Sequence, residues 1–115
     1  MNLPNAESAF VDINKLRSYS LDPSHHRGKH KARLFAAVLG FTAADAEELK
    51  AILLSAAQQY EAKLEPPTEY GERYIVDFPI TRFQNQATIR SSWIIRLTED
   101  FPRLTSCFII RRQAT

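Results

Sequence analysis

The chain has 115 residues, of which 44% are hydrophobic and 24% charged, and its formal net charge is +2. These values are typical of one globular domain and exclude an intrinsically disordered chain. A charge of +2 is too small to indicate nucleic-acid binding by itself, so the distribution of the charges matters more than their sum.

The single cysteine excludes an intrachain disulfide and is compatible with a reducing compartment. The first ten residues lack the basic and apolar regions of a signal peptide. No apolar run approaches the ~18 residues of a membrane span. We therefore expect one cytoplasmic domain over residues 1–115, with no membrane partner. Its helical half is expected over about 1–65 and its sheet half over about 69–112.

Two short helices are predicted first. Asp12 caps a helix through Tyr19, which stops before Asp22-Pro23 because the residue before a proline disfavours the α conformation. The stretch KHKARLFAAVLG predicts the second helix, with Gly40 at the left-handed position that follows a helix end.

A third helix of about five turns is predicted to be amphipathic. Thr42 and Asp45 form a capping box at its start, and the sequence EPP at positions 65–67 ends it. Its apolar residues recur every three or four positions and comprise Leu49, Ile52, Leu53, Ala56, Tyr60 and Leu64.

The second half changes to a two-residue period, which predicts strands. YGERYIVDFPIT, QATIRSSWIIRL and RLTSCFIIRR are three strands separated by the turns FQNQ and TEDFP, and SAFVD is a candidate edge strand. Short connections favour antiparallel neighbours. The predicted fold class is α+β, with N-terminal helices packed on one face of a three- to four-stranded antiparallel meander sheet.

Alternation assigns the side chains of each strand to one of the two faces. Trp93, Tyr60 and Tyr74 are predicted to be core, and Tyr70 to be exposed. In the last strand, Leu104, Ser106, Phe108 and Ile110 are predicted to face the helices, and Thr105, Cys107 and Ile109 to face away. Cys107 lies in the apolar run CFII, where a small buried thiol is favoured over a nucleophile.

The uncovered face is predicted to be polar. It shows Asp77, Arg90, Ser92 and Thr105, a positive and hydroxyl-rich set that suits a phosphate. A half-exposed antiparallel sheet turns polar residues outward in any case, so a surface without function remains an alternative.

All three histidines lie in LDPSHHRGKHKARLF, residues 21–35, with no acid between Asp22 and Asp45. Gly28 permits a tight turn before the second helix. The next residues then lie in the first helical turn, where free N–H groups and the helix dipole attract anions. Cations at this position conflict with local helix preference, and such conflicts are expected more often at functional sites.

Three interpretations of this stretch stay open. It is a solvated basic loop without function, a phosphate-binding or catalytic cluster, or a metal site made by His25, His26 and His30. The usual zinc spacings are absent, which weakens the metal interpretation. Glycine-rich phosphate loops, G-x-S-x-G elbows and H-E-x-x-H helices are absent as well.

Four runs of the sequence resemble an uncharacterised bacterial domain family over roughly residues 2–110. They are LPNAESAFVDINKLRSYSLDPSHHRGKHKARLFAAVLGF, YGERYIVDF, TIRSSWII and DFPRLTSCFI. That family occurs as small free-standing proteins and at the C-termini of large polymorphic secreted toxins. The layout is more loosely similar to the barnase, colicin and RelE-like ribonuclease-toxin superfamily. That likeness implies a cognate antitoxin or immunity protein as partner.

The sequence departs from barnase-type enzymes because no obvious glutamate base lies on the sheet. Proton transfer therefore falls to His30 or Asp77, or is partly supplied by the RNA or the ribosome. The resulting hypothesis is a metal-independent endoribonuclease of toxin type that needs no cofactor and cleaves RNA by 2′-hydroxyl attack. Histidine suits proton transfer because its ordinary pKa is close to physiological pH.

The predicted site residues fall into two groups. His30 is assigned acid–base chemistry, Lys31 charge stabilisation, Arg90 the clamping of phosphate, and Thr105 a hydrogen bond to phosphate. Preorganised charge of this kind is usually a large catalytic term. The residues assigned to binding phosphate or RNA are Arg27, Lys29, Ser92 and His25. The alternative function is a non-catalytic nucleic-acid- or protein-binding module of a two-protein complex.

Overall fold

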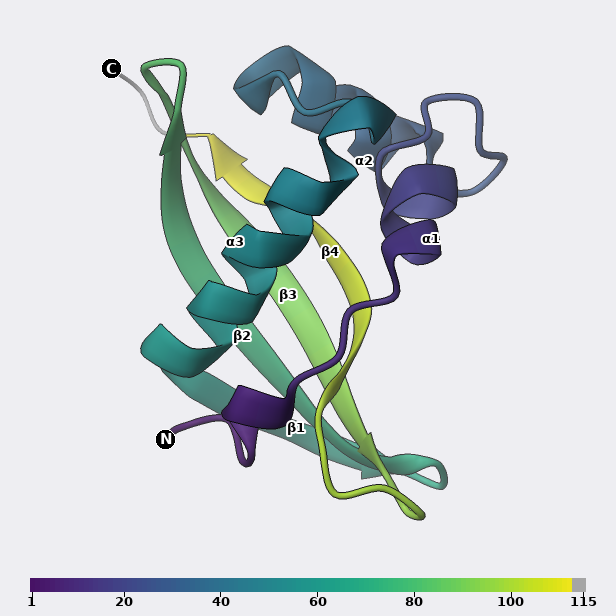
Figure 1. Cartoon of the computed structure of the whole chain (residues 1–115), viewed down its shortest axis with the longest axis vertical. Helices are drawn as coiled ribbons and strands as arrows, with labels where there is room; N and C mark the ends of the chain where they lie inside the picture. The colour runs from purple at the N-terminus through teal and green to yellow at the C-terminus, as the bar shows by residue number, and fades with distance from the viewer. Residues whose placement is uncertain (113–115) are drawn as a thin grey trace.

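A computed structural model describes residues 1–112, which form a helical layer and a sheet (Figure 1). The helices precede the strands, and π-helical turns η2 and η3 continue α1 and α2. In chain order the elements are η1 (Ala6–Ser8), α1 (Ile13–Lys15), η2 (Leu16–Ser20), α2 (Lys29–Leu34), η3 (Phe35–Leu39), η4 (Ala43–Asp45), α3 (Ala46–Gln59), β1 (Ala62–Thr68), β2 (Gly71–Arg82), β3 (Asn85–Arg96) and β4 (Arg103–Arg112).

The strands of this part of the chain form one antiparallel sheet in the order β1-β2-β3-β4. Helices lie over one face of it and leave the other uncovered (Figure 1). The predicted α+β meander is therefore confirmed. No helix among residues 1–112 is long and apolar enough to cross a membrane.

The local features that begin and end the helices agree with the sequence. The Asp12 side chain accepts a hydrogen bond of 2.9 Å from the backbone N–H of Asn14. Gly40 has a φ of 70°, the left-handed conformation that favours glycine. The backbone N–H of Thr42 donates to Asp45 at 2.8 Å within a capping box. These contacts fix where the second helix stops and where the third begins.

The third helix is shorter than predicted. It ends at Gln59, and the chain then forms edge strand β1, in which Ala62 pairs with Val76. The prediction of a helix through Leu64 is wrong because strand pairing overrides the helical periodicity. Pro66 and Pro67 are tolerated because they lie in a register irregularity of this edge strand, between the paired residues Glu65 and Thr68. The sheet half begins at Ala62, ahead of the predicted boundary.

The hydrophobic core lies between the two layers. Trp93 is 1% exposed, and its indole N–H donates to the Ser91 hydroxyl at 2.9 Å. That hydroxyl donates in turn to the carbonyl of Val76 at 2.7 Å, so the buried polar atoms have partners. Trp93 and Tyr74 are core residues and Tyr70 is exposed, as predicted, but Tyr60 is 36% exposed and only rests beside Phe78.

Strand β4 departs from simple alternation. Ser92 pairs with Ser106, but the next residue, Trp93, pairs with Leu104, so Thr105 is the extra residue of a bulge. A one-residue slip sends every later side chain to the opposite face. Another irregularity follows at Ile110, between the pairings of Ile109 and Arg111.

The predicted faces of β4 are therefore wrong beyond the bulge. Cys107 and Ile109 are buried toward the helices, whereas Ser106 and Phe108 lie opposite residues of the open face. Leu104 faces inward and Thr105 is exposed, as predicted. Burial raises the pKa of the Cys107 thiol to about 12, which agrees with a structural and unreactive cysteine.

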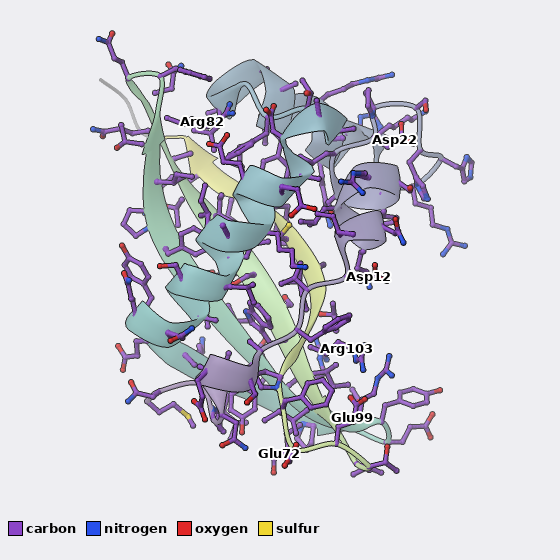
Figure 2. The ribbon with its side chains drawn as sticks, viewed as in Figure 1. Asp12, Asp22, Glu72, Arg82, Glu99 and Arg103 are labelled. Atoms are coloured by element: carbon purple, nitrogen blue, oxygen red, sulfur yellow. The ribbon has the colours of Figure 1, made fainter. Side chains whose placement is uncertain are left out.

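The N-terminal segment reaches the free edge of β4. The backbone N–H of Phe10 donates to the carbonyl of Pro102 at 2.9 Å, and that of Leu104 donates to Phe10 at 3.0 Å. The candidate edge strand SAFVD thus contributes a single parallel bridge, between Phe10 and Arg103. Arg103 and Glu99 lie toward one end of the sheet, and Arg82 lies toward the opposite end (Figure 2).

Candidate functional site

The basic stretch before α2 is a tightly built turn. Nδ1 of His25 accepts hydrogen bonds from the backbone N–H groups of Arg27 at 3.0 Å and Gly28 at 3.1 Å. The imidazole ring also packs edge-on against Tyr19, with ring centroids 4.4 Å apart. A Cβ on Gly28 would lie 2.8 Å from the Tyr19 carbonyl oxygen, so only glycine fits there. The contacts of His25 are thus structural.

Asp22 stabilises the start of the same turn. Its carboxylate accepts hydrogen bonds from the hydroxyl of Ser24 at 2.6 Å and from the backbone N–H of Ser24 at 2.9 Å. These bonds lower the pKa of Asp22. The acid at the head of the basic stretch is therefore engaged locally and does not neutralise the cations that follow it.

The cations of this region have no ion-pair partner among residues 1–112. None of Arg27, Lys29, Lys31 and Arg33 lies within ion-pair distance of a carboxylate there, and His26 and His30 are exposed. These cations are available to an anionic ligand without breaking an ion pair within the described residues.

On the open face, Arg90 is held by Asp77. The two side chains come from paired positions of β2 and β3, and both carboxylate oxygens accept hydrogen bonds of 2.9 Å from the guanidinium. This pair raises the pKa of Arg90. The outward positions predicted for Asp77 and Arg90 agree with this register.

A groove of about 640 Å³ lies beside this pair, at the β1 side of the open face. It contains two further acids and a lysine from β1 and its preceding turn, so it is lined by charges of both signs. The lining residues are Tyr60, Glu61, Ala62, Lys63, Glu65, Ile75, Asp77 and Arg90. The groove gives this face the shape of a binding site rather than of a flat sheet.

The second helix meets the open face at the β4 edge. The Nζ of Lys31 lies 4.1 Å from the centroid of the Phe108 ring. Phe108 is the β4 neighbour of Arg90, because their Cα atoms are paired in the sheet register. Lys31, Phe108, Arg90 and Asp77 therefore form one continuous row across the sheet, which we call the cross-strand row.

The remaining predicted residues are placed less favourably. Thr105 uses its hydroxyl to donate to the carbonyl of Ser92 at 3.0 Å, within the bulge. Ser92 is half-buried and lies between Ile75 and Ser106 in the register. His30 directly precedes Lys31 in α2 and makes no hydrogen bond to residues 1–112 through its side chain. The structure brings Lys31 and Arg90 to one row, and His25 lies apart in the loop turn.

Several side chains that complete this face are not predicted as site residues from the sequence. Tyr60, Lys63 and Glu65 line the groove because the chain after Gln59 is a strand, which the helical pattern concealed. The sequence predicts Asp77 on the uncovered face and as a possible base, but not as the ion-pair partner of Arg90. Its position directly across from Arg90 becomes visible once the two strands are aligned on the turn between them.

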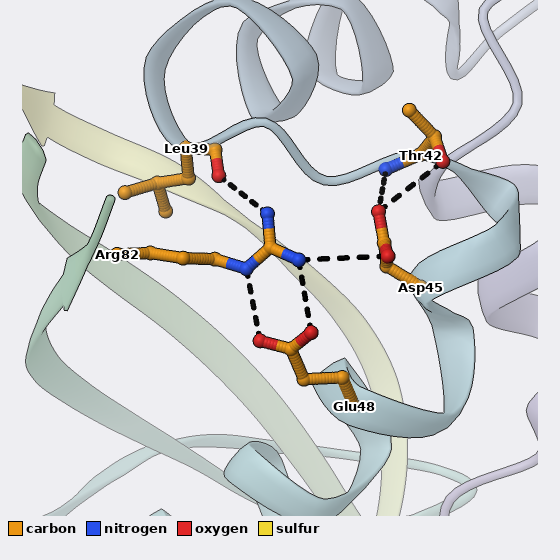
Figure 3. Close-up of polar contacts among 5 residues, drawn as sticks. All are labelled: Leu39, Thr42, Asp45, Glu48 and Arg82. Atoms are coloured by element: carbon orange, nitrogen blue, oxygen red, sulfur yellow. Dashed lines mark hydrogen bonds and ion pairs between the residues drawn. The ribbon is translucent and has the colours of Figure 1, made fainter.

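A second polar cluster was missed entirely and lies on the helix side (Figure 3). Arg82 donates two hydrogen bonds of 2.9 Å to Glu48 and one of 2.7 Å to the carbonyl of Leu39. Its guanidinium also lies 4.1 Å from the centroid of the Phe41 ring. Arg82 follows Ile80 on the inward face of β2. A charged residue at an inward position indicates a buried polar contact, and this is the signal in the sequence that could have predicted the cluster.

This cluster connects the β2–β3 hairpin to the helical layer. The bonds raise the pKa of Arg82 and lower that of Glu48, chiefly through the hydrogen bonds between the two side chains. The Arg82 side chain is only 10% exposed, so it is less accessible to a ligand than the cations of α2. We assign it a structural role.

The part of the chain that the structure describes has no group of three or more His, Cys, Asp or Glu side chains arranged to hold a metal ion. The metal interpretation of the three histidines thus lacks a ligand set within residues 1–112.

Comparison with curated proteins and with solved structures finds no significant match to either. One protein-family model matches residues 2–111, nearly the whole chain, and its description is Domain of unknown function (DUF6883). The chain therefore belongs to this family of unknown function, in agreement with its resemblance to an uncharacterised domain family.

Proposed function

We propose that the chain is a metal-independent endoribonuclease that binds the scissile phosphate of RNA between Lys31 and Arg90. The supporting observation is the cross-strand row, in which a cation of the second helix contacts Phe108, the strand neighbour of Arg90. A free ammonium and a fixed guanidinium on one row suit a phosphodiester, whose negative charge grows in the transition state.

Proton transfer is assigned to Asp77, at one end of this row, and to His30, the sequence neighbour of Lys31 in α2. Asp77 accepts the proton of the 2′-hydroxyl while the oxygen forms a bond to phosphorus. Its partner Arg90 uses Nε and Nη2 in their ion pair, so Nη1 faces no competing carboxylate within that pair. His30, next to Lys31 in α2, gives a proton to the departing 5′-oxygen. The products are a 2′,3′-cyclic phosphate and a 5′-hydroxyl.

The decisive test is RNA cleavage by the purified chain in EDTA. Asp77→Asn is expected to lower the rate by about 10²- to 10⁴-fold, the usual contribution of a general base. Lys31→Ala is expected to lower it through lost charge stabilisation, whereas Arg96→Ala, at an exposed arginine 3.9 Å from Glu99, is the control and leaves it unchanged. Wild-type protein that cleaves none of a varied set of RNAs would contradict the proposal.

A protein partner that neutralises this activity is part of the proposal. Ile75 and Ile94 lie half-buried on strands of the open face, and apolar side chains beside paired charges suit a protein surface. A partner that covers this face would block the groove. The expected result is that co-expression with the cognate partner relieves growth inhibition, and that Ile75→Asp abolishes the relief.

The ion pair between Asp77 and Arg90 also favours a second function, a non-catalytic module of a two-protein complex. In that case Arg90 serves mainly to neutralise Asp77 inside an interface. Binding of RNA or protein with a steep salt dependence and without any RNA product would support this alternative over the nuclease.

A further inference from the structure

We propose that Phe108 is a base-stacking residue that binds single-stranded RNA beside Arg90, an inference that rests on the proposed function. The bulge at Thr105 is its structural origin. Without the extra residue, Phe108 would face the helices, as the alternation of β4 predicts. With it, the ring lies on the open face, opposite Arg90.

The contact between Lys31 and the ring of Phe108 can be replaced by a contact with a ligand. In the free protein, the ammonium of Lys31 lies 4.1 Å from the ring centroid and has no carboxylate partner among residues 1–112. A base that stacks on this ring displaces the ammonium, and the phosphate of the bound nucleotide becomes its new partner. The lysine therefore shields the aromatic surface in the free protein and follows the ligand when RNA binds.

The geometry favours a single strand over a duplex. Stacking on a side chain requires a base whose face is free, and bases inside a duplex are stacked on one another. Adjacent strands are about 4.8 Å apart, so the cross-strand row offers closely spaced contacts with phosphate and base. At its β1 side the row opens into the groove, where Tyr60 provides a second partly exposed ring. The RNA thus crosses the strands from the β4 edge toward the groove.

Nucleic acid fits this surface better than an acidic protein does. An acidic segment would pair with the free cations of α2 but has no requirement for an aromatic ring beneath one of them. Single-strand binding combines cations that follow the backbone with aromatic rings on which bases stack. Lys31 and Phe108 provide both within one contact.

The test measures binding of a labelled single-stranded 2′-O-methyl RNA of about 12 nucleotides, within the usual range of site sizes. This probe lacks the attacking hydroxyl, so it cannot be cleaved by the proposed mechanism. Phe108→Leu keeps an apolar side chain but removes the ring, and is expected to weaken binding about 5- to 100-fold. Phe108→Tyr retains the ring and is expected to keep wild-type affinity.

Phe10→Leu is the matched control. Phe10 is also a partly exposed phenylalanine under a cation, with the Arg103 guanidinium 4.8 Å from its ring, but it lies outside the cross-strand row. Its substitution is expected to leave the dissociation constant unchanged. The midpoint of thermal unfolding of each variant separates lost stacking from lost folding, and Phe108→Tyr keeps the test valid if Phe108→Leu unfolds.

Polyphosphate and a duplex of the same sequence complete the experiment. Polyphosphate presents charge without bases, so its binding is expected to be unaffected by Phe108→Leu, and the duplex is expected to bind more weakly than the single strand. Equal single-strand affinity of Phe108→Leu and wild type overturns the inference. Absence of binding by the wild type, or equal binding of duplex and single strand, overturns it too.

Different results would contradict the nuclease proposal and the proposal of a stacking residue. Binding that depends on Phe108, without cleavage of unmodified RNA, overturns the nuclease and leaves the stacking residue. Cleavage by wild type together with unchanged single-strand binding in Phe108→Leu overturns the stacking residue and leaves the nuclease.

Discussion

Three arginines of the sheet and the cations of the second helix differ in whether they form ion pairs within residues 1–112. Arg82, Arg90 and Arg103 each lie 2.7–2.9 Å from a carboxylate. Lys29 and Lys31 of α2 form no ion pair within residues 1–112. A cation that holds a carboxylate contributes to the fold, whereas a free one is ready for a ligand. At the cross-strand row, Lys31 of the second set and Arg90 of the first are both neighbours of Phe108.

The difference follows from where each set lies. The paired arginines join segments that are far apart in sequence or hold turns, as Arg82 joins the hairpin to Glu48 and Arg103 holds Glu99 after β3. The cations of α2 lie on a short helix beside an edge strand, with no acid of their own segment after Asp22. Substitutions of Arg82 and Arg103, which lie outside the cross-strand row, should therefore change stability, and substitutions in the second set should change binding.

The largest expected effect is on stability, at Arg82. Arg82→Met removes the bonds to Glu48 and Leu39 and the contact with Phe41. It is expected to lower the free energy of unfolding by about 2–3 kcal/mol, because the Arg82 side chain is only 10% exposed while Glu48 stays accessible to water. Urea denaturation measures this. Arg96→Met is the control and is expected to lower the free energy of unfolding by about 0.5 kcal/mol or less. Equal losses in the two variants would show that the contacts of Arg82 do not stabilise the fold.

Much of the fold follows from local sequence. Asp12, Gly40 and the Thr42–Asp45 capping box specify helix ends through contacts within a few residues. The alternation of β2 and β3 places Arg90 outward and Trp93 inward, because these strands pair without a bulge. Predictions based on such short-range patterns agree with the structure since no long-range contact competes with them.

The site depends on long-range contacts, so less of it was predictable. The bulge at Thr105 leaves no mark in the periodicity of β4, yet it decides that Phe108 lies on the open face and Cys107 in the core. The approach of Lys31 to Phe108 depends on how α2 packs on the β4 edge. The apolar pattern of the third helix continues to Leu64, although β2 recruits that segment as a strand.

The second-largest expected effect is on the affinity for RNA, and it arises from the cations of α2. Lys29→Ala/Arg33→Ala removes two charges without ion-pair partners in the described residues. It is expected to reduce the slope of log binding constant against log salt by about 1.4 for a single strand. The measurement is binding of the 2′-O-methyl RNA between about 50 and 200 mM salt. Arg17→Ala/Arg96→Ala removes the same charge at residues that lie 3.6 and 3.9 Å from glutamates, and should change the slope less.

A matching change in stability is not expected. Both double variants should unfold within about 0.5 kcal/mol of the wild type, as is usual for surface substitutions. If the α2 variant loses stability and keeps its salt slope, the cations serve the fold, and the contrast between the two sets is wrong.

The smallest expected effect is the pH dependence of the Arg82 cluster. Hydrogen bonds from Arg82 lower the pKa of Glu48 below its ordinary value of 4.5. The unfolded chain therefore takes up this proton at a higher pH than the folded chain does. The stabilisation is complete above the ordinary value and is lost as the pH falls through the lowered, folded one.

Glu48→Gln removes this titration and leaves an amide oxygen to accept from Arg82. The Glu48 side chain is 49% exposed, so the effect is expected to be no more than about 1 kcal/mol. The free energy of unfolding is measured in urea at pH 6 and pH 3. The wild type should exceed the variant at pH 6, and the difference should shrink at pH 3. A difference that is the same at both pH values would mean that Glu48 titrates alike in the folded and unfolded chains, and that its bonds to Arg82 add no pH-dependent stability.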